Sequence, residues 1–379
     1  MKKTLVASTV TAGLMVLSFA SPAAADPTDL YPAALNGSGS DTTEIVMKAL
    51  DARIPALGSW DVTGGNWDTN GTAAGCAFTG RNAGSGAGRT SLANSVSNGD
   101  GCFQFARSSA RSTTANTANQ TAIGYTATTP GVAVPLLPIT LAVDGLTYVF
   151  RKGSGTPRDL TIGQLRGIYN CAFTSEVDTL FLGGQTVPNR PLLPTDLSGT
   201  RADWMSLMGL TAGADVASDP GGTLPACIDD GPGDTGIGVG GAPGEFSEHN
   251  GNVLTNARMI IPHSIAQYVA QGRSSVGDFR GLAELGYING QVPLQMYDNP
   301  ASTLNKDTAS GSVVNDGAFF REVYNIVPAA NVNDAGITAV FGTRSGGTAA
   351  AGSDVPNVNS GEICNLDSVL ISTGFLPVC

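Results

Sequence analysis

Apolar positions along this chain form short segments between long stretches of glycine, serine, threonine and asparagine. Residues 131–150 are apolar and β-branched, which predicts buried strands of an α/β sheet, although Pro135 and Pro138 favour a connection between strands over one central strand. Residues 257–262 predict a further strand, and Ser264 begins a helical pattern. The alternation of such segments with amphipathic ones predicts the α/β class.

Helical spacing is clearest after two polar loops. Residues 159–169 predict a capped amphipathic helix. Residues 37–44, Gly-Ser-Gly-Ser-Asp-Thr-Thr-Glu, lead into an apolar stripe formed by Ile45, Val46, Ala49 and Leu50. Asp41 with Glu44 predicts a capping box.

The loop at 37–44 also has the chemistry of an anion site. The first N–H groups of a helix lack internal partners and carry partial positive charge, and glycines allow a ligand to approach the backbone. Ser40, Thr42 and Thr43 would add hydroxyl donors. The same sequence also suits a plain helix start, and both interpretations remain open at this point.

Two further loops repeat the arrangement. Residues 197–201, Leu-Ser-Gly-Thr-Arg, precede a helical run containing Trp204, Leu207 and Met208. Residues 107–112, Arg-Ser-Ser-Ala-Arg-Ser, follow a strand-like alternation at 102–105. We expect the three loops to converge on one oxyanion.

Other polar segments predict loops. Residues 60–100 predict long loops held by Cys76 and Cys102, and residues 220–244 predict an extended surface loop held by Cys227. The run 84–89, Gly-Ser-Gly-Ala-Gly-Arg, is similar to a phosphate loop but lacks the Gly-Lys-Ser/Thr ending and a helical sequel, so we interpret it as a flexible turn.

Six cysteines are present, and they allow fifteen pairings. The simplest is sequential: Cys76 with Cys102, Cys171 with Cys227, and Cys364 with Cys379. Metal ligation by cysteine is disfavoured because no Cys-x-x-Cys occurs, and His249 and His263 are the only histidines. We predict disulfides, no metal and no cofactor.

The N-terminus predicts export. Lys2 and Lys3 precede an apolar run, and Ala23-Ala24-Ala25 fits a cleavage site, so residues 1–25 are interpreted as a signal peptide. No cysteine precedes Cys76 to form a lipobox, and no later stretch is apolar enough to span a bilayer. We expect a secreted or extracytoplasmic protein.

The charge balance argues against nucleic acid as a partner. The formal net charge is −11, and removal of the signal peptide would leave 18 basic against 31 acidic residues. Binding to a phosphate backbone relies on clustered Lys and Arg. A buried site for a small anion depends on local donors instead and stays compatible with an acidic chain.

The order of motifs resembles the phosphate-binding component of bacterial ABC importers, in the type II periplasmic-binding-protein superfamily, and most of all its secreted actinobacterial relatives. The resemblance covers most of residues 35–290 and rests on the following segments: 37–43, 144–148, 159–161, 165–169, Arg190, 198–201, 248–251 and 260–267. It implies two α/β lobes around a ligand cleft, joined by two crossovers. The first lobe would hold 26–142 and 257–379, and the second 143–256.

The resemblance also implies a binding role and no enzymatic activity, a monomer, and an ABC permease as partner. Residues carried over onto this sequence would contact a dehydrated oxyanion, most of all inorganic phosphate. They are Ser40, Asp41, Thr42, Ser108, Ser109, Arg111, Arg190, Ser198, Gly199 and Thr200.

One departure keeps the ligand open. The phosphate-specific pattern has an aspartate in the third loop to accept the proton of hydrogen phosphate, whereas residues 107–111 here contain no carboxylate. Asp41 could replace that acceptor. Sulfate-like, phosphonate and carboxylate ligands remain alternatives.

Two other functions are weighed. A secreted serine hydrolase would need Ser198 or Ser264 as nucleophile and His249 or His263 as base, but no Gly-x-Ser-x-Gly motif occurs, and both histidines are expected to be ordinary hinge or surface residues. A binding module for a protein or the cell wall would use the long polar loops and agrees with the missing lipid anchor.

Overall fold

The computed structural model describes residues 26–27, 33–69, 76–109, 123–126, 133–173, 187–194, 198–210, 224–225, 227–230, 246–273, 277–293, 313–315, 318–342 and 361–377. The predicted signal peptide, Arg111 and most of 220–244 lie outside these residues. Among the described residues, no helix is both long and apolar enough to cross a membrane.

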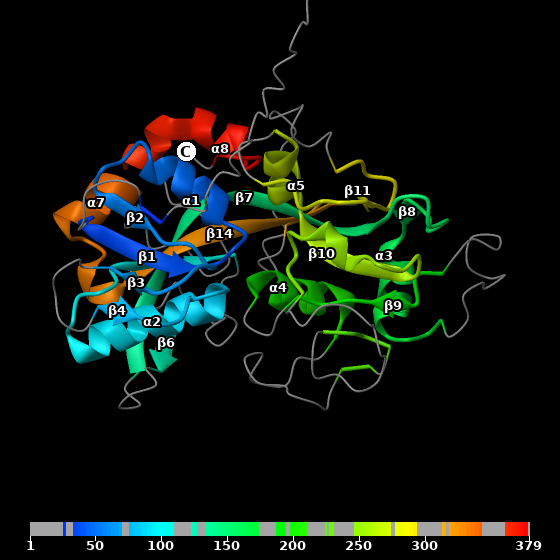
Figure 1. Ribbon diagram of the computed structural model, residues 1–379, viewed down its shortest axis with the longest axis horizontal. Helices are drawn as coiled ribbons and strands as arrows, with labels where there is room; N and C mark the ends of the chain where they lie inside the picture. Colours follow the sequence, from blue (N-terminus) through cyan, green and yellow to red (C-terminus); the bar gives the residue numbers. More distant parts are fainter. Residues whose placement is uncertain are drawn as a thin grey trace, which may run out of the picture.

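The protein is a mixed α/β structure with two lobes, as expected (Figure 1). A ten-stranded sheet has the main order β2-β1-β5-β14-β7-β10-β9. Its two longest strands, β7 (Ala133–Arg151) and β14 (Ala318–Pro328), pair antiparallel along most of their length and run from one lobe into the other.

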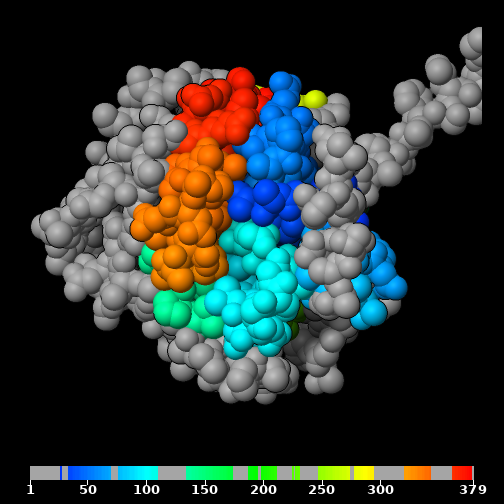
Figure 2. Space-filling model, turned by 90° about the vertical axis from the view of Figure 1, so that its left-hand side faces the viewer, coloured from blue at the N-terminus to red at the C-terminus, as the bar shows by residue number. Residues whose placement is uncertain are grey.

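The first lobe surrounds one end of this strand pair. Its elements are β1 (Leu35–Gly39), α1 (Glu44–Asp51), β2 (Leu57–Ser59), β3 (Trp67–Asp68), β4 (Ala77–Phe78), α2 (Ser85–Asn98), β5 (Phe105–Ser108), β6 (Ile123–Thr126), β13 (Val313–Asn315), η3 (Ala329–Asn331), α7 (Ala335–Phe341), η4 (Glu362–Leu366) and α8 (Asp367–Ser372). One core cluster packs Met47 and Leu50 of α1 against Phe105 and Phe341. Helices α1, α7 and α8 contribute to this core, whereas α2 packs into a separate core through Leu92 and Ala93. Figure 2 shows the residues of α7 and α8 (orange and red) above those of α2 (cyan).

The second lobe surrounds the other end of β7. Its elements are β8 (Asp159–Leu160), α3 (Ile162–Tyr169), β9 (Arg190–Pro191), α4 (Gly199–Met208), η2 (Gly251–Val253), β10 (Met259–Ser264), α5 (Ile265–Gly272), β11 (Ala283–Leu285) and β12 (Tyr287–Ile288). Its cores form around Trp204 and Tyr169 on one side and Ile261 and Leu285 on the other. Because residues 259–288 pack with these cores, we propose that the chain returns to the first lobe near β13 rather than at 257.

Several local predictions are confirmed. The capped helix predicted over 159–169 is present as α3 from Ile162 to Tyr169, with Thr161 as its cap, whereas Asp159–Leu160 form β8. Ser264 begins α5 as its cap. Disulfides join Cys76 to Cys102 and Cys171 to Cys227. The third predicted pair includes Cys379, which lies outside the described residues.

The expectation for Pro135 and Pro138 is wrong, since 133–151 form one continuous central strand. Pro138 pairs with β14, but it lies between the part of β7 that pairs with β6 and the part that pairs with β10. Pro135 pairs with β6, but it lies beyond Leu136, the last residue of β7 that pairs with β14. Among the described strands, each proline is therefore paired on one flank only. A proline can be accommodated on an unpaired flank because it has no N–H to donate.

The expectation of long loops across 60–100 is also wrong, because Ser85–Asn98 form helix α2. The helix buries small residues, including Gly86, Gly88 and Ala93, against the sheet and therefore lacks an apolar stripe in the sequence. Gly88 is required at a close approach: a Cβ there would lie 2.6 Å from Gly39 Cα.

Candidate functional site

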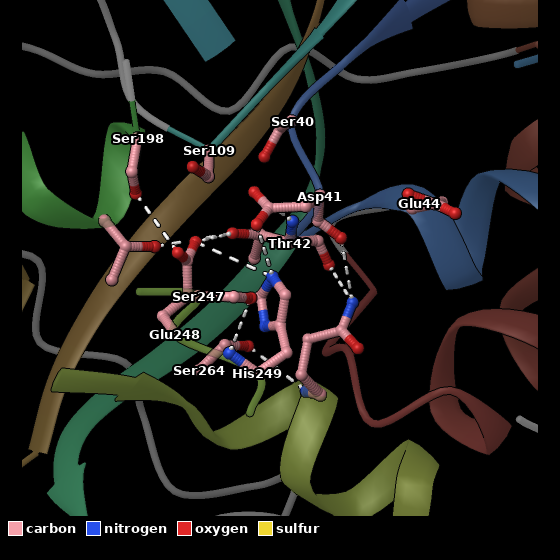
Figure 3. A network of polar contacts seen from close by, with 12 residues as sticks. Ser40, Asp41, Thr42, Glu44, Ser109, Ser198, Ser247, Glu248, His249 and Ser264 are labelled. Atoms are coloured by element: carbon pink, nitrogen blue, oxygen red, sulfur yellow. Dashed lines mark hydrogen bonds and ion pairs between the residues drawn. The ribbon is translucent and has the colours of Figure 1, made fainter. Parts of the chain in front are cut away.

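Three pairs of buried hydroxyl residues from distant parts of the chain meet where the two lobes face each other. They are Ser40 with Thr42, Ser85 with Ser109, and Ser198 with Thr200. The Oγ1 atoms of Thr42 and Thr200 lie 3.3 Å apart across the lobes. Figure 3 shows Ser40, Ser109 and Ser198 around one region beside Thr42 and the carboxylate of Glu248. We call these six residues the hydroxyl cluster.

Each pair lies at the start of a helix. Ser40 and Thr42 follow β1 and precede α1, Ser85 is the first residue of α2, and Ser198 caps α4 by accepting a hydrogen bond from Arg201 N at 3.2 Å. Helix N-termini favour negative charge because their first N–H groups lack internal partners. Three helix starts at one place are the kind of surroundings that favour negative charge.

Ser40 has the strongest sign of a missing partner. Its side chain is fully buried, and its Oγ makes no hydrogen bond with any described residue. Buried hydroxyls in native structures are nearly always hydrogen-bonded, so an orphan of this kind needs an explanation. A bound ligand is one such explanation.

Glu248 places a carboxylate beside the hydroxyl cluster. Its side chain is 1% exposed, and it accepts hydrogen bonds from Thr42 Oγ1 at 2.9 Å and Ser198 Oγ at 3.2 Å. Burial raises the pKa of Glu248, and the charge of Asp41 raises it further. The carboxylate can accept a hydrogen bond from a ligand, but it repels a ligand that is fully ionised.

His249 pairs with two carboxylates below the cluster (Figure 3). Its Nε2 lies 3.2 Å from Asp41 Oδ2 and 3.7 Å from Glu248 Oε1. Burial lowers the pKa of His249, but the charges of Asp41 and Glu248 outweigh it and raise this pKa to about 9. Burial alone would raise the pKa of Asp41. The charge of His249 outweighs that effect, so the pKa of Asp41 is lowered.

Arg321 brings a guanidinium to a hydroxyl group of the cluster. It pairs with Asp144 at 3.0 Å and with Asp203 at 3.3 Å, and its Nη2 lies 3.5 Å from Thr42 Oγ1. Two carboxylates therefore share its charge. Arg107 has a structural role instead, since its fully buried guanidinium donates to Ser40 O and Trp60 O.

The predicted ligand residues are only partly brought together. Five of them belong to the hydroxyl cluster: Ser40, Thr42, Ser109, Ser198 and Thr200. Gly199 begins α4, and Ser108 is buried in β5. Arg190 lies in β9, where its backbone pairs with Met259. No recorded contact of the described residues joins Arg190 to the cluster, and Arg111 is not described.

Two predictions about local chemistry are wrong. Asp41 and Glu44 form no capping box, because Thr43 occupies the cap without a side-chain bond, and the Asp41 carboxylate turns to His249 and Thr42 N instead. The segment 84–89 is not a flexible turn, since Ser85 opens α2 and bonds Ser109 through Oγ at 3.2 Å.

The histidines are not surface residues. His263 is fully buried, and the side chain of His249 is 13% exposed. His263 Nδ1 bonds the backbone oxygen of Ser264, whose hydroxyl donates to Asp144. Among the described residues, no histidine ring nitrogen hydrogen-bonds a serine hydroxyl, so the geometry of a serine hydrolase is not assembled there.

Sequence reasoning missed Ser85, Glu248 and Arg321 as members of the site. The run Gly84-Ser85-Gly86 has the glycines and the serine of an anion loop. However, the sequence after it does not show the pattern of a helix, so it was not predicted to belong to the site. Glu248 lies in the segment 248–251 that carries the family resemblance, but nothing in a single sequence places it beside Thr42. Arg321 carries no sequence signal at all.

No protein-family model and no curated protein sequence matches this chain. Solved structures do match. An ABC-type phosphate transport receptor from Vibrio cholerae is 16% identical, covers 90% of this chain and 99% of its own, and has a TM-score of 0.44. A phosphate-binding protein from Stenotrophomonas maltophilia is 15% identical, with coverage of 91% and 90% and a TM-score of 0.45. At these levels of likeness, function must be argued from the site itself.

Proposed function

We propose that this protein is a solute-binding protein that holds a small, protonated oxyanion in the hydroxyl cluster, with hydrogen phosphate as the leading ligand. The observation that carries the proposal is the meeting of three helix starts with buried hydroxyls, one of which, Ser40 Oγ, has no partner among the described residues. Hydroxyl and backbone donors can surround an oxyanion in a dry site without a dedicated counter-charge.

The carboxylate of Glu248 supports a protonated ligand. Hydrogen phosphate has a proton to donate to a carboxylate, whereas sulfate at neutral pH has none and would meet like-charge repulsion. Glu248 would then perform the task for which Asp41 was considered, because it lies directly among the donors from Thr42 and Ser198. Phosphonates with one proton fit the same chemistry.

The wider role follows from the N-terminal pattern. The predicted signal peptide would export the chain, and we propose that it works outside the cytoplasm as a receptor for an ABC permease. Capture would bring the two lobes together, since Thr42 belongs to the first lobe and Thr200 and Glu248 to the second.

Calorimetry tests the proposal. The chain from Asp26, stripped of phosphate, is titrated at neutral pH with phosphate and then with sulfate. We expect saturable binding of phosphate and weaker binding of sulfate. Ser40→Ala and Thr200→Val should each weaken phosphate binding by roughly tenfold or more, because a hydrogen bond to a charged group contributes about 1.5–3 kcal/mol.

Glu248→Gln provides the sharper test. The amide donates where the carboxylate accepts, so phosphate affinity should fall and sulfate affinity should rise. Thr161→Ala is the matched control, because Thr161 is an exposed helix cap in α3, remote from the cluster. Absence of phosphate binding in the folded wild type would remove phosphate as the ligand, and an unchanged preference in Glu248→Gln would remove Glu248 from selection.

A further inference from the structure

The strongest unexplained group outside the hydroxyl cluster is the triad formed by Asp41, Glu248 and His249. One ligand atom from each of them lies within 4.8 Å of the other two. Asp41 comes from the loop before α1, and the other two residues come from the turn before η2 (Figure 3). The triad therefore joins the two lobes.

The spacing of the triad matches a metal coordination sphere. Metal bonds from nitrogen and oxygen of about 2.0–2.2 Å place neighbouring ligand atoms of a tetrahedral ion about 3.3 Å apart. His249 Nε2 lies 3.2 Å from Asp41 Oδ2 and 3.7 Å from Glu248 Oε1. One imidazole and two carboxylates are a usual donor set for divalent transition metals.

Unpaired imidazole nitrogens point to a ligand independently of this spacing. Nε2 of His249 faces the two carboxylates, but its buried Nδ1 makes no hydrogen bond with a described residue. The ring of His263 lies 6.3 Å away, centroid to centroid, at 85° to that of His249. His263 is fully buried and its Nδ1 must donate to Ser264 O at 2.7 Å, which leaves Nε2 with a free lone pair and no partner in the described chain.

The carboxylates are held in place by hydrogen bonds behind them. Glu248 Oε2 accepts from Ser198 Oγ, and Asp41 Oδ1 accepts from Thr42 N at 3.2 Å. The backbone of His249 is fixed as well, since its carbonyl accepts from Gln271 Nε2 at 2.8 Å. Orienting bonds of this kind accompany metal ligands in proteins, where they fix the direction of the lone pairs.

We infer that Asp41, Glu248 and His249 bind a divalent transition-metal ion, for which Zn²⁺ is the probe. The ion neutralises the buried carboxylate of Glu248 and the partly exposed carboxylate of Asp41, which a single histidine otherwise shares. It also places positive charge beside Thr42, where Arg321 is already occupied by Asp144 and Asp203. The second effect rests on the proposed function, because it concerns the anion.

The test is a titration of the chelator-stripped chain from Asp26 with ZnCl₂ in phosphate-free buffer. We expect one saturable site, and we expect His249→Gln and Asp41→Asn to weaken it by roughly tenfold or more, as loss of a metal ligand does. The control is Glu284→Gln, which removes a carboxylate on β11 that lies 3.8 Å from the ammonium group of exposed Lys152. The site would be overturned if the wild type failed to bind Zn²⁺, or if His249→Gln and Asp41→Asn both bound Zn²⁺ as tightly as the wild type.

A measurement on the wild type removes any dependence on how the variants fold. X-ray absorption of the Zn²⁺-loaded protein should show imidazole scattering together with oxygen ligands. The sequence has only two histidines, so an imidazole signal reports on this location. A sphere of oxygen atoms alone would contradict the inference.

Phosphate titrations with and without Zn²⁺ separate this inference from the proposed function. Zn²⁺ binding in a protein that never binds phosphate would uphold the metal site and reject the proposed ligand. If the protein never binds Zn²⁺ and its affinity for phosphate is the same with and without chelator, the metal site is rejected and the proposed ligand is upheld.

Discussion

Arg321 and Asp144 face each other in adjacent antiparallel strands and form a buried ion pair with Nη2 and Oδ2 3.0 Å apart. Asp144 is fully buried, and it also accepts from Ser264 Oγ and Ala266 N. Arg321 reaches Asp203 of α4 at 3.3 Å. The pair thus ties the central strands to the starts of two helices in the second lobe.

Replacement of Asp144 should lower the free energy of unfolding substantially. Asp144→Asn leaves the guanidinium of Arg321 with only the partly exposed Asp203, and breaking a buried pair typically costs about 3–5 kcal/mol. Urea unfolding of this variant should show that loss at an unchanged m-value. Glu322→Gln, on the same strand but partly exposed, should cost much less, and equal losses would contradict the importance of the pair.

Gly88 in α2 should respond to alanine in the opposite way from an ordinary helical glycine. A Cβ there would lie 2.6 Å from both Gly39 Cα and Ser38 O, so Gly88→Ala should push the loop before α1 away and destabilise by about 1–3 kcal/mol. Gly163→Ala in α3 meets only Thr161 Oγ1 at 3.8 Å and should gain about 0.5–1 kcal/mol. Thermal melts of both variants check the difference, and a stabilised Gly88→Ala would refute the contact.

Two helix caps should differ in their cost. Ser264 caps α5 and also donates to buried Asp144 at 3.0 Å, whereas Thr161 caps α3 at the surface. Loss of a cap alone costs about 1 kcal/mol. Ser264→Ala should therefore cost more than Thr161→Ala by about 1–3 kcal/mol, because a buried carboxylate loses a donor. Paired denaturation curves measure this, and equal costs would contradict the expectation.

His263 should make the fold sensitive to acid. Burial lowers the pKa of His263 to about 3, and the charge of His249 acts in the same direction. Because the folded pKa lies below the unfolded value of about 6.5, the contribution is present above that value and is lost as pH falls toward 3. In the presence of a chelator, His263→Asn should flatten the loss of stability between pH 6 and pH 4. A pH series of melting temperatures for variant and wild type tests it, and parallel curves would argue against the assignment.

The two described disulfides should differ in accessibility. Cys76 and Cys102 are each 1% exposed, whereas Cys171 and Cys227 are only partly buried. Mild reductant acting on the native protein should open Cys171–Cys227 first, as alkylation and mass spectrometry would show. The chain closures of 26 and 56 residues each stabilise by roughly 3–4 kcal/mol in the chain-entropy picture. Earlier reduction of Cys76–Cys102 would contradict the order.

Local physics was available from the sequence alone. The sequence predicted the α/β class, the helix starts at Ser198 and Ser264, a capped helix ending at Tyr169 and two disulfide pairings, and the structure confirms them. These features depend on residues close in the chain or on simple pairing. Hydroxyl residues at helix starts were recognisable because capping chemistry is local.

Tertiary packing decided what the sequence could not. Helix α2 forms on a run of small residues because they fit closely against β1. Strand β7 continues through two prolines because each of them pairs with a described strand on one flank only. The carboxylate of Asp41 does not cap α1 as expected, because folding brings His249 Nε2 within 3.2 Å of it. Glu248 and Arg321 reach Thr42 from more than two hundred residues away along the chain. Contacts of that range depend on how the two lobes pack, and no local pattern records them.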